Sequence, residues 1–455
     1  MEKLSSLQIT KHTRATVSLL ALSGTVLMPA MHGQSAPPSA EKTWTPTQPI
    51  TLARSGNSYM NLSLIGDFAA GANSERDTSV VQTGGHDPAQ RGFTVQGLEA
   101  VFEGSVDHYF RAMANIVYAL DTSGESFLEI EEAYLETFSL PGGFQLRAGQ
   151  YLTEFGRINN QHQHAWDFVD APLVSTRFFG PDGLRNPGAR VSWLTPTPFY
   201  SELTFGIQNS GGATAHSFRG EEHDHGDEEE DAHHHADELA FGREPGEREV
   251  LGMRDLLYSA RYALSFDISE TQTLLGGISG AWGPNLYGER TWTQIYGADI
   301  YWKWKAANHH KGFPFVSFQA EAMFRGYGLG AATGEIVDHD AAEHAHIEVD
   351  LPRETAWDWG TYAQVNYGFL PGWIASLRAD FTAPLYRAKY EEIFGEDDAT
   401  RARRWRISPA ISWYPSEFSR VRLQYNYDRL ENSRSAHGVW LQVEFLLGSH
   451  GAHKF

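Results

Sequence analysis

Apolar and polar side chains alternate along most of this chain from Tyr59 onward. The same unit recurs: about ten residues of alternating polarity, a break, and then a further run of similar length. The clearest run is 420–428, where Val421, Leu423, Tyr425 and Tyr427 alternate with Arg, Gln, Asn and Asp residues. A period of two is typical of β-strands that have one apolar and one polar face. The pattern therefore predicts an all-β protein.

The spacing of these runs predicts sixteen antiparallel strands. They are expected at 59–69, 93–106, 109–120, on both sides of the turn at 140–143, around 189–193 and 202–208, at 256–267, 272–282, 292–305, 314–327, 357–369, 373–381, 404–414 and 420–428, and from Val439 onward. Most connections alternate between long and very short. This asymmetry predicts a closed sixteen-stranded transmembrane β-barrel with short periplasmic turns, long extracellular loops and both termini in the periplasm.

One stretch also carries a family resemblance. Residues 131–156 read EEAYLETFSLPGGFQLRAGQYLTEFG, two alternating runs that meet at a tight Pro/Gly turn. The stretch resembles the fourth and fifth strands of phosphate-selective-porin-like (porin O/P-type) outer-membrane barrels. The resemblance implies a porin in the outer membrane of a Gram-negative bacterium, embedded in its lipid. Over the rest of 58–448 the resemblance is one of architecture only.

The N-terminus predicts export. Basic residues precede an apolar segment at 15–27, so residues 1–33 are expected to be a signal peptide cleaved between 30 and 36. Residues 34–57 are expected to be a periplasmic linker, 58–448 the barrel and 449–455 a His-containing tail. The linker is too short for the plug of a TonB-dependent receptor, which makes that class a weaker alternative. Phe455 is similar to the terminal aromatic with which the barrel assembly machinery recognises its substrates.

Charge limits the partners. The formal net charge is −21, and removal of the signal peptide makes the chain more acidic. Nucleic acid is therefore not an expected partner, because binding it requires a positive face. Family analogy alone suggests a homotrimer.

The strongest chemical signal is metal binding. In residues 221–238, between two predicted strands, ten of the eighteen residues are acidic and five are histidines. A second predicted outer loop has a similar composition. Imidazole and carboxylate suit zinc and other divalent transition metals, and both loops are similar to the metal-gathering loops of zinc-transport proteins. The alternative is a solvated acidic loop. The candidate ligands are His223, His225, His233, His234, His235, Asp224, Asp231, His339, His344 and His346.

Two further sets of residues are expected inside the barrel. The loop 158–187 has the length and position to fold into the pore, as the corresponding loop does in the family it resembles. Its candidate constriction residues are His162, His164, Asp167, Asp170, Arg177 and Arg185. Inward positions on the strands give the candidate lumen residues Arg190, Glu202, Arg261, Asp299, Glu321, Arg325, Arg378, Asp380 and Arg422. Positive and negative side chains are mixed among them, which argues against an anion-selective filter and favours a preference for cations.

No catalytic motif is present, so an enzyme is not expected and no cofactor is required. The sequence favours a porin-like channel for passive uptake of small solutes, with divalent metal, zinc first, gathered by the His/Asp/Glu-rich loops. One alternative is a general porin for small polar solutes or anions. Another is a surface metal-binding protein for which the barrel is only an anchor.

Overall fold

The structure is a computed structural model that describes residues 48–138, 140–220, 242, 243, 245, 246, 248–338, 345–394, 401–430 and 434–448. At 334–338, 345–349 and 394 it describes the backbone alone. The chain divides into two compact units, 1–44 and 45–455, and everything below concerns the second.

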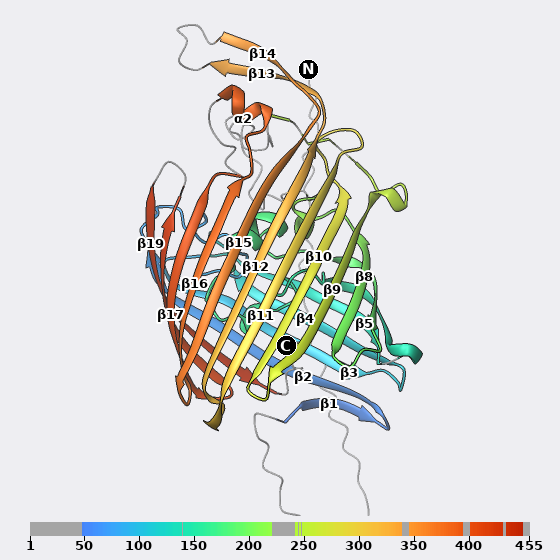
Figure 1. Ribbon diagram of the computed structural model, residues 1–455, viewed down its shortest axis with the longest axis vertical. Helices are drawn as coiled ribbons and strands as arrows, with labels where there is room; N and C mark the ends of the chain where they lie inside the picture. The colour runs from blue at the N-terminus through green and yellow to red at the C-terminus, as the bar shows by residue number, and fades with distance from the viewer. Residues whose placement is uncertain are drawn as a thin grey trace, which may run out of the picture. The chain divides into compact units, whose positions relative to one another are not determined.

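Sixteen antiparallel strands form a closed barrel, as the alternation predicted (Figure 1). Each barrel strand pairs with the next barrel strand along the chain. The last barrel strand pairs with the first, where Val443 lies opposite Phe68. The barrel strands are β2 (Ser58–Asn73), β3 (Gly92–Ser105), β4 (Phe110–Leu120), β5 (Ser126–Thr137), β6 (Phe144–Leu152), β7 (Arg185–Leu194), β8 (Tyr200–Asn209), β9 (Leu256–Ser269), β10 (Gln272–Pro284), β11 (Trp292–His310), β12 (Phe313–Leu329), β15 (Glu354–Leu370), β16 (Trp373–Pro384), β17 (Arg404–Ser416), β18 (Ser419–Arg429) and β19 (Ser435–Leu447).

The remaining elements lie outside this ring of strands or in its connections. β1 (Ile50–Ser55) pairs with the start of β2, inside the segment predicted as a linker without strands. β13 (Ala332–Asp338) and β14 (Ala345–Leu351) form a hairpin between β12 and β15. The α-helices are α1 (Leu173–Phe179) and α2 (Lys389–Phe394), and four 3-10 turns are η1 (Pro141–Gly143), η2 (Gln163–Ala165), η3 (Ala213–Ala215) and η5 (Met253–Asp255). Among the described residues, no helix is long and apolar enough to cross a membrane.

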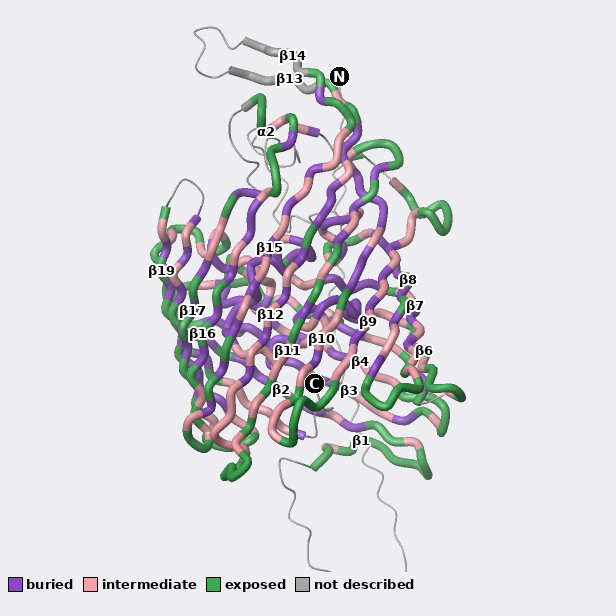
Figure 2. Tube along the Cα trace, viewed as in Figure 1, coloured by how far each residue is buried: buried purple, intermediate pink, exposed green. Residues whose placement is uncertain are grey.

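The two faces of each strand differ as the alternation requires. On β18, Arg422 is 1% exposed and faces the interior, whereas Leu423 is 47% exposed on the outer surface. Figure 2 shows the same alternation of buried and exposed positions along the neighbouring strands. Apolar side chains that face outward are in contact with lipid, so the polar face has to lie inside.

Short turns lie at one rim of the barrel and the longer loops at the other, with two departures from expectation. Residues 306–310 were predicted as part of a turn, but β11 continues through His310 and a tight turn follows at Lys311 and Gly312. Both have positive φ (51° and 85°), which suits a two-residue hairpin turn. The last loop was predicted to be long, yet it spans only 430–434 because β19 begins at Ser435.

Two β-bulges change which side chains face the lumen. In the pairing of β3 with β2, Gln96 has no partner, and in the pairing of β5 with β4, Glu131 has none. An extra residue in one strand shifts the alternation by one position. As a result, the consecutive residues Glu131 and Glu132 are both buried inside the barrel.

An apolar core fills one side of the interior. Phe155, Phe178 and Phe179 from the connection between β6 and β7 pack against inward-facing side chains such as Leu257 and Met323. A sixteen-stranded barrel is too wide for the side chains of its own strands to fill, and here the folded loop supplies the apolar filling on this side.

Candidate channel lumen

The connection between β6 and β7, residues 153–184, lies inside the barrel and is called the lumen loop. Its backbone and side chains bond to inward-facing groups on strands around much of the ring. The Gly156 amide donates to Ser279 Oγ (3.0 Å) on β10, and the Ile158 amide donates to Glu321 Oε1 (2.7 Å) on β12. On another side of the lumen, the carbonyl oxygen of Trp166 accepts hydrogen bonds from Arg420 and Arg422 on β18. The loop therefore crosses the passage.

Asp170 is the most heavily bonded residue of the lumen loop. It is fully buried and accepts hydrogen bonds from Arg378 Nη2 (2.6 Å) and Arg406 Nη1 (3.0 Å). Gln424 and Asn426 of β18 donate to the same carboxylate. Charged hydrogen bonds in a buried setting are the strong ones, so this carboxylate fixes the loop to β16, β17 and β18.

His162 fixes the opposite side of the loop. Its Nδ1 lies 2.6 Å from Glu131 Oε2 and its Nε2 lies 3.0 Å from Glu132 Oε2, which requires a proton on both ring nitrogens. Burial alone would lower the pKa of His162, but the two carboxylates outweigh it and raise the pKa well above the ordinary value. His164 lies beside it, 3.0 Å from Glu99, and its pKa is raised in the same way.

This geometry predicts that the loop loosens at alkaline pH. A histidine with a raised folded-state pKa stabilises the fold fully below its unfolded pKa of about 6.5, and the effect is lost as pH rises through the folded value. Amide hydrogen exchange of residues 159–165, corrected for intrinsic rates, is expected to speed up over that range. The variant His162→Asn should exchange fast at every pH. Equal, pH-independent protection in both proteins would contradict the assignment.

The other predicted constriction residues are also tied to the barrel. Asp167 accepts hydrogen bonds from Gln364 and Asn366 on β15. Arg177 donates to the carbonyl oxygens of residues 401 and 402 in the β16–β17 loop. Arg185 lies at the start of β7 rather than in the loop and pairs with Glu129 (2.9 Å).

The predicted lumen residues are inward-facing, and most are paired. Arg261 pairs with Asp299 (2.6 Å), Arg325 with Asp358 (2.9 Å) and Arg378 with Asp380 (2.9 Å). Arg190 forms ion pairs with Glu136 and Glu154. The other predicted lumen residues form hydrogen bonds: Arg422 with Gln442, Glu321 with Tyr362, and Glu202 with Tyr200. Such pairs neutralise each other and give the passage little net charge on these strands.

Two cavities lie against the lumen loop. One of 460 Å³ is lined by Glu202 and Arg261, and one of 240 Å³ is lined by Arg111 and Glu132. Glu154, Asn160 and Gln161 line both. Their wall positions belong to the halves of the strands nearer the short turns, which places both cavities between the lumen loop and the rim of short turns.

The sequence did not single out the acid-rich part of the wall. Five carboxylates gather beside the lumen loop and are here called the acidic cluster. Its members are Glu99, Glu129, Glu131, Glu132 and Asp182. Glu131 and Glu132 are in the stretch that carries the resemblance, but strict alternation puts them on opposite faces. The bulge that places both inside has no signal in the local sequence.

All but one of the predicted metal ligands lie outside the described residues, namely those in 221–238, His339 and His344. His346 belongs to β14, where only the backbone is described, opposite Val337 of β13.

A closed sixteen-stranded barrel with an apolar outer face and a loop folded into its interior is a porin-like barrel of the bacterial outer membrane. No protein-family model matches the chain. A protein of Aquifex aeolicus (strain VF5), described only as uncharacterized, is 29% identical over 430 residues, which is 87% of this chain and 80% of that protein.

Solved structures similar to this chain include outer-membrane channels and porins. The channel DcaP of Acinetobacter baumannii is 13% identical, with 86% of this chain and 98% of that chain covered and a TM-score of 0.49. The anion-selective porin of Comamonas acidovorans is 8% identical, with 86% and 100% covered and a TM-score of 0.49. OprB of Pseudomonas putida is 8% identical, with 86% and 94% covered and a TM-score of 0.47. The resemblance to phosphate-selective porins in particular stays a prediction.

Proposed function

We propose that the protein is a passive porin-like channel for small solutes that prefers cations, divalent transition metals among them. The observation that carries the proposal is the acidic cluster beside the lumen loop. Its five carboxylates face three positive groups, which are Arg185 and the protonated rings of His162 and His164, so negative charge remains in excess. A passage lined by an excess of one charge attracts ions of the opposite sign.

The composition of the outer segments supports the metal part of this proposal. Residues 221–238 and the region around His339 and His344 combine imidazole with many carboxylates, which would raise the concentration of divalent cations near the channel mouth. A general porin for small polar solutes is the second candidate. The paired Arg and Asp side chains along β9–β16 favour it, because they leave that part of the wall with little net charge.

Ion selectivity separates the two candidates. In planar bilayers under a potassium chloride gradient, the reversal potential of the wild type is expected to have the sign of a cation-selective pore. The double variant Glu131→Gln/Glu132→Gln should shift it toward zero, while Glu125→Gln, in an exposed outer loop, should leave it unchanged. A wild-type reversal potential near zero would favour the general porin over the cation-selective channel. A reversal potential with the sign of an anion-selective pore would refute the proposal.

A further inference from the structure

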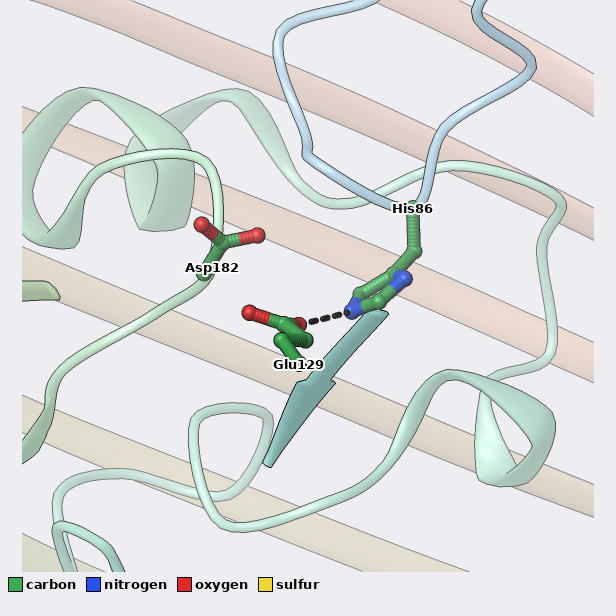
Figure 3. Close-up of side chains that lie close together, drawn as sticks. All are labelled: His86, Glu129 and Asp182. Carbon is green, nitrogen blue, oxygen red and sulfur yellow. Dashed lines mark ion pairs between the residues drawn. The ribbon is translucent and has the colours of Figure 1, made fainter. Parts of the chain in front are cut away.

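Three segments that are distant in the sequence bring one imidazole and two carboxylates together inside the barrel. His86 comes from the β2–β3 loop, Glu129 from β5, and Asp182 from the end of the lumen loop (Figure 3). Each offers a ligand atom, and these atoms lie within 4.8 Å of one another. The three residues are called the His86 site.

The His86 ring is held in one orientation. Its Nδ1 lies 3.3 Å from the carbonyl oxygen of Gln96, the residue at the β3 bulge, and Gln96 Nε2 donates back to the His86 carbonyl (2.9 Å). A histidine whose Nδ1–H donates to a carbonyl presents the lone pair of Nε2 to the other side. This is the arrangement that metal-ligating histidines adopt.

Glu129 offers a second donor atom. Its Oε2 accepts a hydrogen bond from Arg185 Nη2 (2.9 Å), which fixes the carboxylate. Its Oε1 is shielded from solvent and accepts no hydrogen bond from any residue in the described part of the chain. A buried carboxylate oxygen without a donor is costly, so each such atom calls for an explanation.

The spacing of His86 and Glu129 fits a bridging ion better than a direct hydrogen bond. Nε2 and Oε1 are 3.6 Å apart, beyond the range of a good N–H···O hydrogen bond. Two ligand atoms on a tetrahedral zinc ion, each bonded at about 2.0–2.2 Å, stand ~3.4 Å apart. Small side-chain movements would therefore complete the coordination.

The backbone brings Asp182 close to the same point. The amide of Gly85 donates to the carbonyl of Pro181 (3.0 Å), which joins the β2–β3 loop to the lumen loop. A Cβ atom on Gly85 would overlap Asp182 Oδ1, so glycine leaves room for this position of the carboxylate. Glu131 Oε1, 4.0 Å from His86 Nε2, adds a further negative charge.

We infer that the His86 site binds a divalent transition-metal ion, with zinc the best match to one imidazole and two carboxylates. The inference rests on the proposed function, because the ion would be cargo held within the passage. It places a metal site inside the lumen, separate from the His/Asp/Glu-rich outer segments. The competing occupant is a proton on Nε2, which would make the cluster an ion pair only.

The test measures zinc binding to the full-length chain, refolded in detergent without a polyhistidine tag. The outer histidines would obscure the result, so they are changed to asparagine in a loop-substituted chain. The changed positions are His223, His225, His233, His234, His235, His339, His344 and His346. Competition with a fluorescent chelator gives affinity and stoichiometry, and Co²⁺ absorption reports the coordination number.

The loop-substituted chain is expected to keep one zinc site. His86→Ala and Glu129→Gln should each weaken that site about tenfold or more. His108→Ala, at an exposed periplasmic turn, is the matched control and should bind as before. Heat-modifiable migration in gels checks that every variant is folded.

Two results would overturn the inference: no zinc site in the loop-substituted chain, or a site unaffected by His86→Ala and Glu129→Gln. Conductance of the same protein keeps this failure apart from failure of the proposed function. If the protein is a cation-selective channel but has no zinc site, the inference about the His86 site is refuted and the proposed channel function stands. If the protein binds zinc at the His86 site but does not conduct, the proposed channel function is refuted and the zinc site stands.

Discussion

Asp170→Ala is expected to release the lumen loop from β16, β17 and β18. The change leaves Arg378 and Arg406, both about 1% exposed, without one of their two carboxylate partners. Breaking a buried ion pair from one side costs about 3–5 kcal/mol, and the lower end applies here because Asp380 and Asp428 remain. Open-channel current should therefore become larger and noisier.

Single-channel recording and limited proteolysis measure this effect. New cleavage is expected within 153–184 while the barrel itself stays resistant. The control is Asp77→Ala, an exposed aspartate in the β2–β3 loop that bonds only within its own turn. Unchanged current and unchanged cleavage in Asp170→Ala would show that other contacts suffice to hold the loop.

Glu136→Ala is expected to lower the stability of the barrel more than any change in the loop. This fully buried carboxylate on β5 pairs with Arg111, Arg147 (2.6 Å) and Arg190 (3.1 Å). Its loss leaves the buried guanidinium groups of Arg147 and Arg190 close together, with Glu154 as a remaining partner of Arg190, whereas the Arg111 side chain is half exposed. Leaving buried charges unpaired costs about 3–5 kcal/mol.

The temperature at which the folded gel band converts to the unfolded one measures this loss. It should fall clearly for Glu136→Ala and stay at the wild-type value for Glu125→Ala, an exposed glutamate in the β4–β5 loop. A wild-type value for Glu136→Ala would mean that solvent screens the three arginines.

The sequence predicted the barrel because one physical rule applies to every strand. Leu423 faces lipid and Arg422 faces the lumen, and this period of two needs no knowledge of neighbouring strands. The strand end at 306–310 was missed because it is polar, and a polar stretch beyond the bilayer can still pair as a strand. β1 was missed because it lies outside the ring of barrel strands, where it pairs with the start of β2.

The site was harder to predict than the fold. Loop length and family resemblance indicated a loop inside the pore, and His162 and Asp170 were among its candidates. Their partners depend on long-range geometry. The bulge at Glu131 shifts the alternation, and the approach of Asp182 to His86 depends on how two loops pack. Neither has a local sequence signal.

In the proposed channel, the barrel conducts and the lumen loop sets the width of its passage. Leu152 and Arg185 are paired neighbours on β6 and β7, so a short Gly/Ser linker can replace residues 157–181 without moving either strand. The most direct measurement is the single-channel conductance of the wild type and of this shortened chain. The wild type is expected to show a small conductance and the shortened chain one several-fold larger. No conductance in either protein, or equal conductance in both, would contradict this expectation.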